Sequence, residues 1–368
     1  MPLTAGIVGL PNVGKSTLFN AITKSQVLAA NYPFATIEPN VGIVAVPDER
    51  LDVLAKMYNP KKTTPATCEF TDIAGLVKGA SKGEGLGNQF LANIRNCDAI
   101  LQVVRCFIDP NVVHVEGSID PVRDAKIINL ELILADLDTV TKRLPKLEKK
   151  AQAKTDDAPF EYELLKKIEA CLLEEKPVRS LIFSEQEEKY VKNYALLTAK
   201  PFMYVANIKD DFLANPDEDE VYTKFKAYAL AEGSAICPIS AEIEAELAGL
   251  GDEEATEFLS ELGVKEPGLH RLIRETYNLL GYQTFFTTGP DECKAWTFKK
   301  GMKAPECAGI IHTDFEKGFI KAETISYDDL IKSGTYLKAR ELGLVRQEGK
   351  DYIVKDGDII LFKFNVTK

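Results

Sequence analysis

Residues 9–16 read Gly9-Leu10-Pro11-Asn12-Val13-Gly14-Lys15-Ser16, which fits the pattern G-x-x-x-x-G-K-[ST] at every fixed position. An apolar run at residues 3–8 precedes this stretch and predicts a buried strand, and residues 16–22 after it predict a helix. Glycines let backbone N–H groups curl around phosphate oxygens, and the N-terminus of a helix adds a partial positive charge. The stretch therefore predicts a phosphate-binding loop (P-loop) between a strand and a helix.

The side chains of this loop suit a nucleoside triphosphate and its metal ion. Lys15 places a cation on the β- and γ-phosphates, which makes it a candidate catalytic residue, and Ser16 offers a hydroxyl to Mg²⁺. We expect six consecutive residues to bind the nucleotide: Asn12, Val13, Gly14, Lys15, Ser16 and Thr17.

Two further segments supply the rest of a triphosphate site. Asp72 and Gly75 lie in the sequence TDIAG at the end of an apolar run, where the aspartate can hold Mg²⁺ through water and the glycine amide can reach the γ-phosphate. The polar segment 31–36 contains Thr36, which can give Mg²⁺ a second hydroxyl, although a plain surface loop is the alternative. We predict metal ligands at Ser16, Thr36 and Asp72, and a catalytic role for Gly75.

Two segments occupy the places where a GTPase grips its base. Asn207-Ile208-Lys209-Asp210 follows an apolar run, as N-K-x-D does, and Ser240-Ala241-Glu242 stands where S-A-K would stand. The order of motifs is that of a translation-factor-type G domain. Ile208 replaces the lysine that packs on guanine, whereas Asp210 keeps the carboxylate that accepts two guanine N–H bonds. We predict that Asn207, Ile208 and Ser240 contact the base.

The pattern of apolar residues along the chain indicates three regions. Apolar runs at 68–73, 99–107 and 201–207 alternate with helical stretches, which favours an α/β fold with a parallel sheet. From about residue 130, apolar residues recur at three- and four-residue steps, which predicts an antiparallel, coiled-coil-like helical hairpin. We therefore predict a P-loop G domain at 1–130 and 197–280, a helical insertion at 131–196, and a small α+β domain at 281–368 with strands at 295–299, 318–323, 352–354 and 358–364.

Composition excludes several classes of protein. The chain has 368 residues, 45% hydrophobic, and a net charge of −11, which argues against coating DNA by bulk electrostatics. Residues 131–280 carry a net charge of −12, so the two ends are balanced and can touch RNA through local clusters. Apolar stretches are too short for a membrane span. The seven cysteines contain no C-x-x-C pair and predict reduced, packed thiols in a cytoplasmic protein.

The sequence resembles the Obg-like ATPase family, the YchF-type P-loop proteins. The resemblance spans nearly the whole chain and is carried by Gly9–Thr17, NYPFATIEPN at 31–40, DIAGLVKGASKGEGLG at 72–87, VRCFID at 104–109, HVEG at 114–117, and a C-terminal block from 285 to 319. It implies a G domain with an inserted helical domain and a C-terminal TGS domain of β-grasp fold. It also implies Mg²⁺-dependent nucleotide hydrolysis, ribosome binding, and a preference for ATP over GTP.

Hydrolysis needs a group that orients water, and the sequence offers two substitutes for the usual glutamine. Leu76 follows Gly75 where many GTPases carry that glutamine, and an apolar side chain cannot orient water. His114 is the candidate catalytic replacement by its chemistry and by the resemblance of its segment, and a packing role is the alternative. Asn12 resembles the asparagine that holds K⁺ in potassium-stimulated relatives, so K⁺ is a candidate activator.

Two alternatives to a ribosome-binding ATPase stay open. One is a GTPase of the same architecture, because Asp210 is retained. The other is a nucleotide-gated binding module in which occupancy alone sets partner affinity and turnover is incidental. A cluster of Lys294, Lys299, Lys300 and Lys303 around Trp296 suits contact with ribosomal RNA, with an ordinary solvated strand as its alternative.

Overall fold

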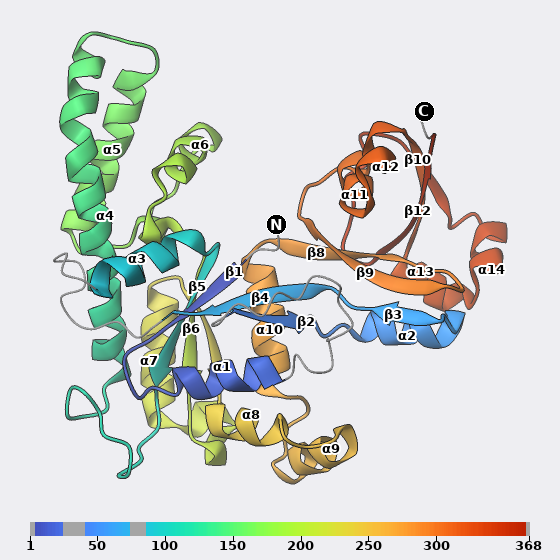
Figure 1. Cartoon of the computed structure of the whole chain (residues 1–368), viewed down its shortest axis with the longest axis horizontal. Helices are drawn as coiled ribbons and strands as arrows, with labels where there is room; N and C mark the ends of the chain where they lie inside the picture. Colours follow the sequence, from blue (N-terminus) through green and yellow to red (C-terminus); the bar gives the residue numbers. More distant parts are fainter. Residues whose placement is uncertain (1–3, 25–40, 74–85, 366–368) are drawn as a thin grey trace. The chain divides into compact units, whose positions relative to one another are not determined.

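The strand that precedes the P-loop belongs to a six-stranded sheet (Figure 1). The computed structural model describes residues 4–24, 41–73 and 86–365. The strand order is β2-β4-β1-β5-β6-β7, and the pairs β1–β4, β1–β5, β5–β6 and β6–β7 are parallel. The strands are β1 (Thr4–Val8), β2 (Val41–Ala45), β4 (Thr67–Asp72), β5 (Ala99–Arg105), β6 (Phe202–Asn207) and β7 (Ala235–Ile239). The predicted parallel α/β sheet is confirmed.

Burial explains why these strands were visible as apolar runs. Every residue of β5 and of β6 is buried, as expected for central strands of a parallel sheet with both faces covered. The helices of this part are α1 (Lys15–Lys24), α3 (Leu86–Asn96), α7 (Glu220–Ala231), α8 (Ala241–Leu247), α9 (Asp252–Glu261) and α10 (Gly268–Leu279), with 3₁₀ turns η5 (Asp210–Phe212) and η6 (Pro216–Glu218). The predicted helix after the P-loop is α1.

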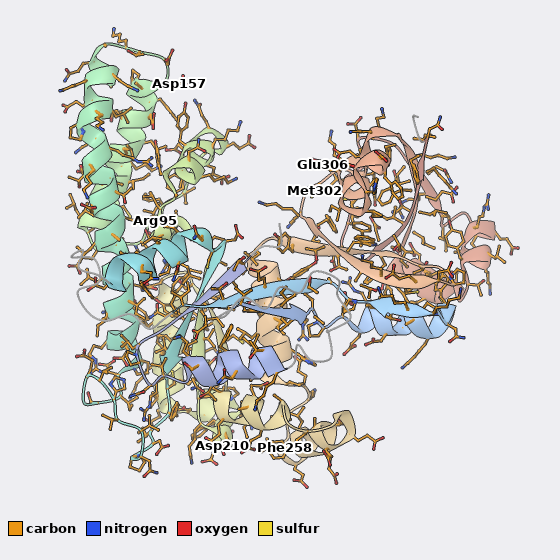
Figure 2. The ribbon with its side chains drawn as sticks, viewed as in Figure 1. Arg95, Asp157, Asp210, Phe258, Met302 and Glu306 are labelled. Atoms are coloured by element: carbon orange, nitrogen blue, oxygen red, sulfur yellow. The ribbon has the colours of Figure 1, made fainter. Side chains whose placement is uncertain are left out.

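A long helical hairpin extends from the sheet and is called the arm below (Figure 1). It consists of α4 (Pro121–Gln152), α5 (Ala158–Leu173) and α6 (Glu185–Tyr194), with 3₁₀ turns η3 (Val178–Ser180) and η4 (Leu197–Ala199). Buried leucines and isoleucines of α4 and α5 form one hydrophobic cluster along its length. Asp157 marks the turn between the two helices at the distal end (Figure 2). The predicted hairpin is confirmed, but α4 begins at Pro121, because Asp120 accepts a hydrogen bond from the Arg123 backbone N–H and caps it.

The C-terminal residues build a second six-stranded sheet. Its order is β11-β10-β12-β8-β9-β3; β12 pairs in parallel with β8, and β8–β9, β10–β12 and β10–β11 are antiparallel. The strands are β3 (Lys62–Thr64), β8 (Tyr282–Thr287), β9 (Glu292–Lys299), β10 (Phe319–Ser326), β11 (Arg346–Glu348) and β12 (Asp358–Phe364), and the helices are α2 (Glu49–Tyr58), α11 (Ala304–Ile311), α12 (Thr313–Lys317), α13 (Tyr327–Ser333) and α14 (Tyr336–Glu341). The strand predicted at 352–354 is wrong: Ile353 makes only an isolated bridge to Lys303.

Compact units divide the chain differently from the predicted domain ranges. Unit 1 comprises Met1–Val44 and Glu69–Leu272, including the arm, and unit 2 comprises Ala45–Cys68 and Ile273–Lys368. Residues 45–68 were predicted to belong to the G domain, but β3 pairs in parallel with β9, and the carbonyl of Leu54 in α2 lies 4.0 Å from the Cys293 sulfur. Because β3 and β9 are far apart in the sequence, no local sequence pattern predicts that they pair.

Two compositional predictions have direct outcomes. All seven cysteines are buried free thiols, which confirms the prediction of packed, reduced side chains. Among the described residues, no helix combines the length and the apolar character needed to cross a membrane.

Candidate functional site: the phosphate loop and its supports

The P-loop joins β1 to α1 in a conformation that requires its second glycine. Gly14 has a φ of +91°, and a Cβ built there would lie 2.2 Å from the side-chain nitrogen of Asn207. Both the backbone and the neighbouring amide therefore exclude any side chain at this position. The Leu18 N–H donates to the Gly14 carbonyl at 2.9 Å and begins the hydrogen bonding of α1. The predicted strand–loop–helix arrangement is present.

The Asn207 side chain connects the P-loop to the ends of two other elements. Its side-chain nitrogen donates to the Val13 carbonyl at 2.9 Å, and its side-chain oxygen accepts from the Ala241 N–H at 3.0 Å. The side chain is 4% exposed, so the strand end of β6, the P-loop and the start of α8 are joined through one buried amide. Sequence reasoning placed Asn207 near the nucleotide base but missed this bracing role, since nothing local indicates the partner.

The other predicted base-contact residues lie beside Asn207. Ile208 is buried, and its N–H donates to the Ile239 carbonyl at 2.9 Å. Ser240 is buried and caps α8, because its hydroxyl oxygen accepts from the Ile243 N–H at 3.3 Å. Asp210 opens the short turn η5 just after β6 (Figure 2). The structure thus brings the ends of β6 and β7 together with the P-loop, while base contact by these residues stays a prediction.

Lys15, the first residue of α1, and Asp72, the last residue of β4, form an ion pair. The Lys15 ammonium donates to the Asp72 carboxylate, and Lys15 is only 8% exposed. The pairing follows from the topology, since β1 and β4 are parallel neighbours with Ile7 opposite Asp72. Ser16 and Thr17, the next residues of α1, are exposed. A buried lysine next to a strand-end carboxylate is the arrangement that phosphate and Mg²⁺ recognition needs.

The donor set available here fits Mg²⁺. The Ser16 hydroxyl and the Asp72 carboxylate are oxygen ligands, and Mg²⁺ prefers oxygen and retains several waters, so two protein ligands suffice. Thr36, the third predicted ligand, and Gly75, predicted to reach the γ-phosphate, lie outside the described residues.

A buried arginine organises the loop that follows β5. The Arg105 guanidinium donates to the carbonyls of Phe107 at 3.2 Å, Val112 at 3.0 Å and Asp109 at 3.1 Å, and it is 1% exposed. Its Cζ atom also lies 4.5 Å from the centre of the Phe107 ring. One side chain therefore fixes the whole turn, a role that sequence analysis did not assign to Arg105.

The same loop is tied to the P-loop. The side-chain nitrogen of Asn12 donates to the Val113 carbonyl at 3.2 Å, and Asn12 has a φ of 62°. Asn12 was predicted to bind the nucleotide and K⁺, and here its amide nitrogen faces the loop. Arg105, acting through the loop, and Asn12 thus connect β5 with the phosphate-binding segment.

His114 is buried with both ring nitrogens engaged. Nδ1 accepts from the Glu116 N–H at 3.1 Å, so Nε2 carries the proton and donates to the Asp124 carboxylate at 2.8 Å. Arg123 pairs with the other oxygen of Asp124 at 2.8 Å. In this arrangement neither nitrogen is free to orient water, and the catalytic role predicted for His114 stays a prediction.

A buried carboxyl group in the middle of α8 joins this helix to the first residue of α10. Glu244 accepts from the Gly268 N–H at 2.8 Å, and burial raises the pKa of Glu244 to about 7. Glu244 lies four residues after Ser240, the residue that caps α8.

Comparisons with known proteins agree with this architecture. Residues 4–142 match the family described as "50S ribosome-binding GTPase", and residues 282–365 match the YchF-GTPase C-terminal family, described as a protein of unknown function. A Bacillus subtilis protein named "Ribosome-binding ATPase YchF" is 58% identical over 366 residues, covering 100% of both chains. The protein of the same name from Escherichia coli O157:H7 is 53% identical over 367 residues, again covering 100% of both.

A solved structure extends the similarity to three dimensions. The Schizosaccharomyces pombe YchF GTPase superposes with a TM-score of 0.89 at 42% identity, covering 98% of this chain and 97% of that one. Its name says GTPase where the names of the bacterial relatives say ATPase, so the names leave the choice of nucleotide open.

Proposed function

The chain belongs to the YchF family, and on that premise we propose that it is a Mg²⁺-dependent ATPase that hydrolyses ATP to ADP and phosphate and binds the ribosome in a nucleotide-dependent way. The observation that carries the proposal is the P-loop in which Gly14 is required, with Lys15 held beside Asp72. Ribosome binding comes from the names of the relatives, and it supports a cytoplasmic location.

Each group near the P-loop has a role in this proposal. The N–H groups of residues 13–17 hold phosphate oxygens, and the Lys15 ammonium leaves the Asp72 carboxylate to neutralise the β- and γ-phosphates. Ser16 and Asp72, with Thr36, would hold Mg²⁺, which when bound neutralises charge that develops on the phosphates. The Gly75 amide would meet the γ-phosphate.

The proposal also states which nucleotide base the protein prefers. We propose that ATP is preferred because Ile208 removes the cation that would pack on guanine, with Asn207 and Ser240 holding the surrounding loops rigid. A GTPase of the same architecture is the alternative, since Asp210 remains available to read guanine.

Two accessory elements complete the catalytic proposal. His114 would orient the attacking water, which requires that it leave Asp124 or the Glu116 N–H. Asn12 would help to place K⁺ as an activator, and replacing K⁺ by Na⁺ should then lower kcat.

We propose that the C-terminal part of unit 2 is a TGS domain of β-grasp fold. The supporting observation is its order β9-β8-β12-β10-β11, in which an antiparallel hairpin is followed by α11 and the last strand lies parallel to the first. Such a domain would serve ribosome contact.

Competition binding tests the nucleotide proposal. Fluorescent ATP and GTP analogues are bound to the purified protein with Mg²⁺ and displaced by unlabelled nucleotides. ATP should win by at least about tenfold, or about 1.4 kcal/mol. A preference for GTP would make the protein a GTPase that reads guanine through Asp210.

Trapping separates the enzyme from a nucleotide-gated binding module. Lys15→Ala should abolish nucleotide binding in both cases. A non-hydrolysable ATP analogue should hold the enzyme on sedimenting ribosomes, whereas ATP should allow release. Equal retention with ATP and the analogue, despite measurable turnover, would favour the binding module.

A further inference from the structure

The segment that carries His114 buries its polar side chain and exposes the apolar side chains on either side. Val113 is 76% exposed and Val115 is 52% exposed, whereas His114 between them is 9% exposed. Burial of an apolar side chain is favourable, and burial of a polar one costs free energy unless hydrogen bonds replace its water. Because the hydrophobic effect alone would favour the opposite arrangement, specific contacts must hold His114 inside.

One of the two contacts of the His114 ring reaches another element. Nδ1 accepts from the N–H of Glu116, which lies two residues further along the same loop. Nε2 donates at 2.8 Å to the carboxylate of Asp124, which lies in the first turn of α4. The bond to Asp124 therefore ties the ring to a helix outside its own loop.

Asp124 is itself firmly held. One of its oxygens accepts from the Arg123 guanidinium at 2.8 and 3.0 Å, and its side chain is buried. The next turn of α4 is attached to the sheet, because the Asn129 side chain donates to the Tyr204 hydroxyl at 2.7 Å. A hydrogen bond to a carboxylate is stronger than one between neutral groups. The bond to Asp124 can therefore keep His114 inside while the two valines stay exposed.

The His114 segment lies between the P-loop and a glycine. The Asn12 side chain donates to the carbonyl of Val113, the residue next to His114, at 3.2 Å. On the other side, Gly117 has a φ of +75°, and no atom lies within 4 Å of a Cβ built there. Gly117 has the backbone freedom of a hinge. A released His114 would therefore be one residue from a P-loop contact.

We propose that Asp124 is a latch that holds His114 in a resting arrangement, and that ATP hydrolysis requires His114 to leave it. Asp124 is then a positioning residue, because it acts on the reaction through His114. The inference rests on the proposed catalytic role of His114 and identifies the contact that restrains it. Removing a latch raises turnover, whereas removing a carboxylate that orients a catalytic histidine lowers it. The sign of the effect on kcat separates these two roles.

The test measures ATP hydrolysis by the full chain and by Asp124→Ala. Alanine favours the helix, and the N-cap of α4 is retained because Asp120 supplies it. The matched control is Asp138→Ala, which removes an exposed carboxylate of the same helix that pairs with Lys142. Asp124→Asn is a milder variant, because its amide oxygen can still accept from the Nε2–H group.

The latch predicts an increase in kcat without a change in KM. Asp124→Ala should raise kcat at least about fivefold, because turnover follows the fraction of molecules in the competent arrangement, while the KM for ATP stays within about twofold. Asp124→Asn should raise kcat about twofold, since a neutral acceptor binds the ring less strongly. Asp138→Ala should leave kcat unchanged. Adding His114→Ala to Asp124→Ala should remove the gain.

A spectroscopic readout reports the latch separately from turnover. The chain has three histidines, so ¹⁵N NMR of histidine-labelled protein gives few ring signals, and His114→Ala identifies those of His114. In the unaltered protein, Nε2 of His114 should carry a proton protected from exchange, with Nδ1 unprotonated. Asp124→Ala should lose this protection and show both tautomers, whereas Asp138→Ala should keep the original pattern.

Each contrary outcome overturns a defined part of the inference. If kcat depends on His114 but is unchanged or lower in Asp124→Ala, the latch alone is wrong. A protected Nε2 proton that persists in Asp124→Ala would mean that another contact holds the ring, which also overturns the latch. If circular dichroism showed that Asp124→Ala does not fold, kcat of Asp124→Asn would decide by the same sign. If the unaltered protein hydrolysed no ATP, or His114→Ala did not lower kcat, the proposed function would fail and the latch with it.

Discussion

Polar side chains are buried and hydrogen-bonded around the P-loop, whereas they are exposed to solvent at the distal end of the arm. Around the P-loop, the side chains of Asn207, Arg105 and His114 are buried, and each has protein partners for several of its polar atoms. At the distal end of the arm, Lys146 and Lys149 are exposed on α4, whose opposite, apolar face packs in the hydrophobic cluster of the arm. The buried hydrogen bonds of Asn207, Arg105 and His114 hold the P-loop region rigidly, and these residues are called the frame below. The exposed lysines of the arm act independently of one another.

This difference predicts how each region responds to substitution. In the frame, one altered atom disturbs several elements, because buried hydrogen-bonding groups left without partners are costly. On the arm, individual lysines should contribute in small, additive steps, as separate exposed sites do. The following predictions test this contrast in order of expected effect.

The largest effect on ATP affinity is expected from Gly14→Ala. The substitution places a Cβ 2.2 Å from the Asn207 side chain at a φ of +91°, so the loop must leave its conformation. ATP affinity should fall at least about 100-fold, or about 2.7 kcal/mol, by titration calorimetry. Gly233→Ala is a matched control, since its φ is +71° and no atom lies within 4 Å of the built Cβ. Retained ATP affinity in Gly14→Ala would show that the frame is not rigid.

Leu144→Ala should loosen the arm and leave the P-loop unaffected. Leu144 is 8% exposed within the apolar cluster, and loss of such a side chain costs about 3 kcal/mol. Hydrogen exchange should therefore accelerate in α4 and α5, while ATP affinity stays within about twofold. A large fall in ATP affinity would contradict the independence of the two regions. Exposed Leu173 provides the control substitution, Leu173→Ala.

Arg105→Lys should weaken the frame by an intermediate amount. Lysine keeps the charge but cannot reach three carbonyls with a planar fork, and we expect a stability loss of about 2 kcal/mol. Because Val113 holds Asn12, ATP affinity should fall about fivefold in equilibrium binding. Arg143→Lys is the control: Arg143 is exposed and its Cζ atom lies 5.3 Å from the centre of the Tyr194 ring, so stability should change by less than about 0.5 kcal/mol and ATP affinity should not change. If both substitutions behaved alike, Arg105 would have no special role.

The smallest effect is expected from Glu244→Gln, and it depends on pH. The pKa of Glu244 is raised to about 7 by burial, so the folded protein is most stable when this group is protonated and loses stability as pH rises from about 4.5 through 7. Glutamine keeps an oxygen for the Gly268 N–H and removes this cost. Urea unfolding should show a gain of about 1 to 2 kcal/mol at pH 8 and little at pH 5. An equal gain at both pH values would exclude the ionisation as its cause.

Local patterns predicted the P-loop and the strands, because their causes are local. Gly14 and Lys15 follow a fixed spacing, and the buried strands β5 and β6 appear as apolar runs. The bracing by Asn207 could not be predicted, since its bonds reach Val13 across most of unit 1. Arg105 was equally hidden, because a buried arginine bound to carbonyls has no sequence signature.

The position of residues 45–68 in the fold could not be predicted from local sequence patterns either. Their pattern of helix and strand fits a G domain as well as it fits the C-terminal sheet. The register of β3 beside β9, with Lys62 opposite Glu292, and the ion pair of Arg50 with Asp356 assign them to unit 2.

That assignment has a practical consequence for dissecting the protein. A fragment ending at residue 280 would retain α2 and β3 without the sheet they complete, exposing Leu51 and Leu54, which are buried in the whole chain. A fragment starting at residue 281 would lack its edge strand, and Asp356 would lose the Arg50 guanidinium that lies 2.7 Å away. Unit 2 is therefore built from two separate segments of the chain. To express the two units as separate proteins, residues 45–68 must be excised from the N-terminal fragment and joined to the C-terminal fragment.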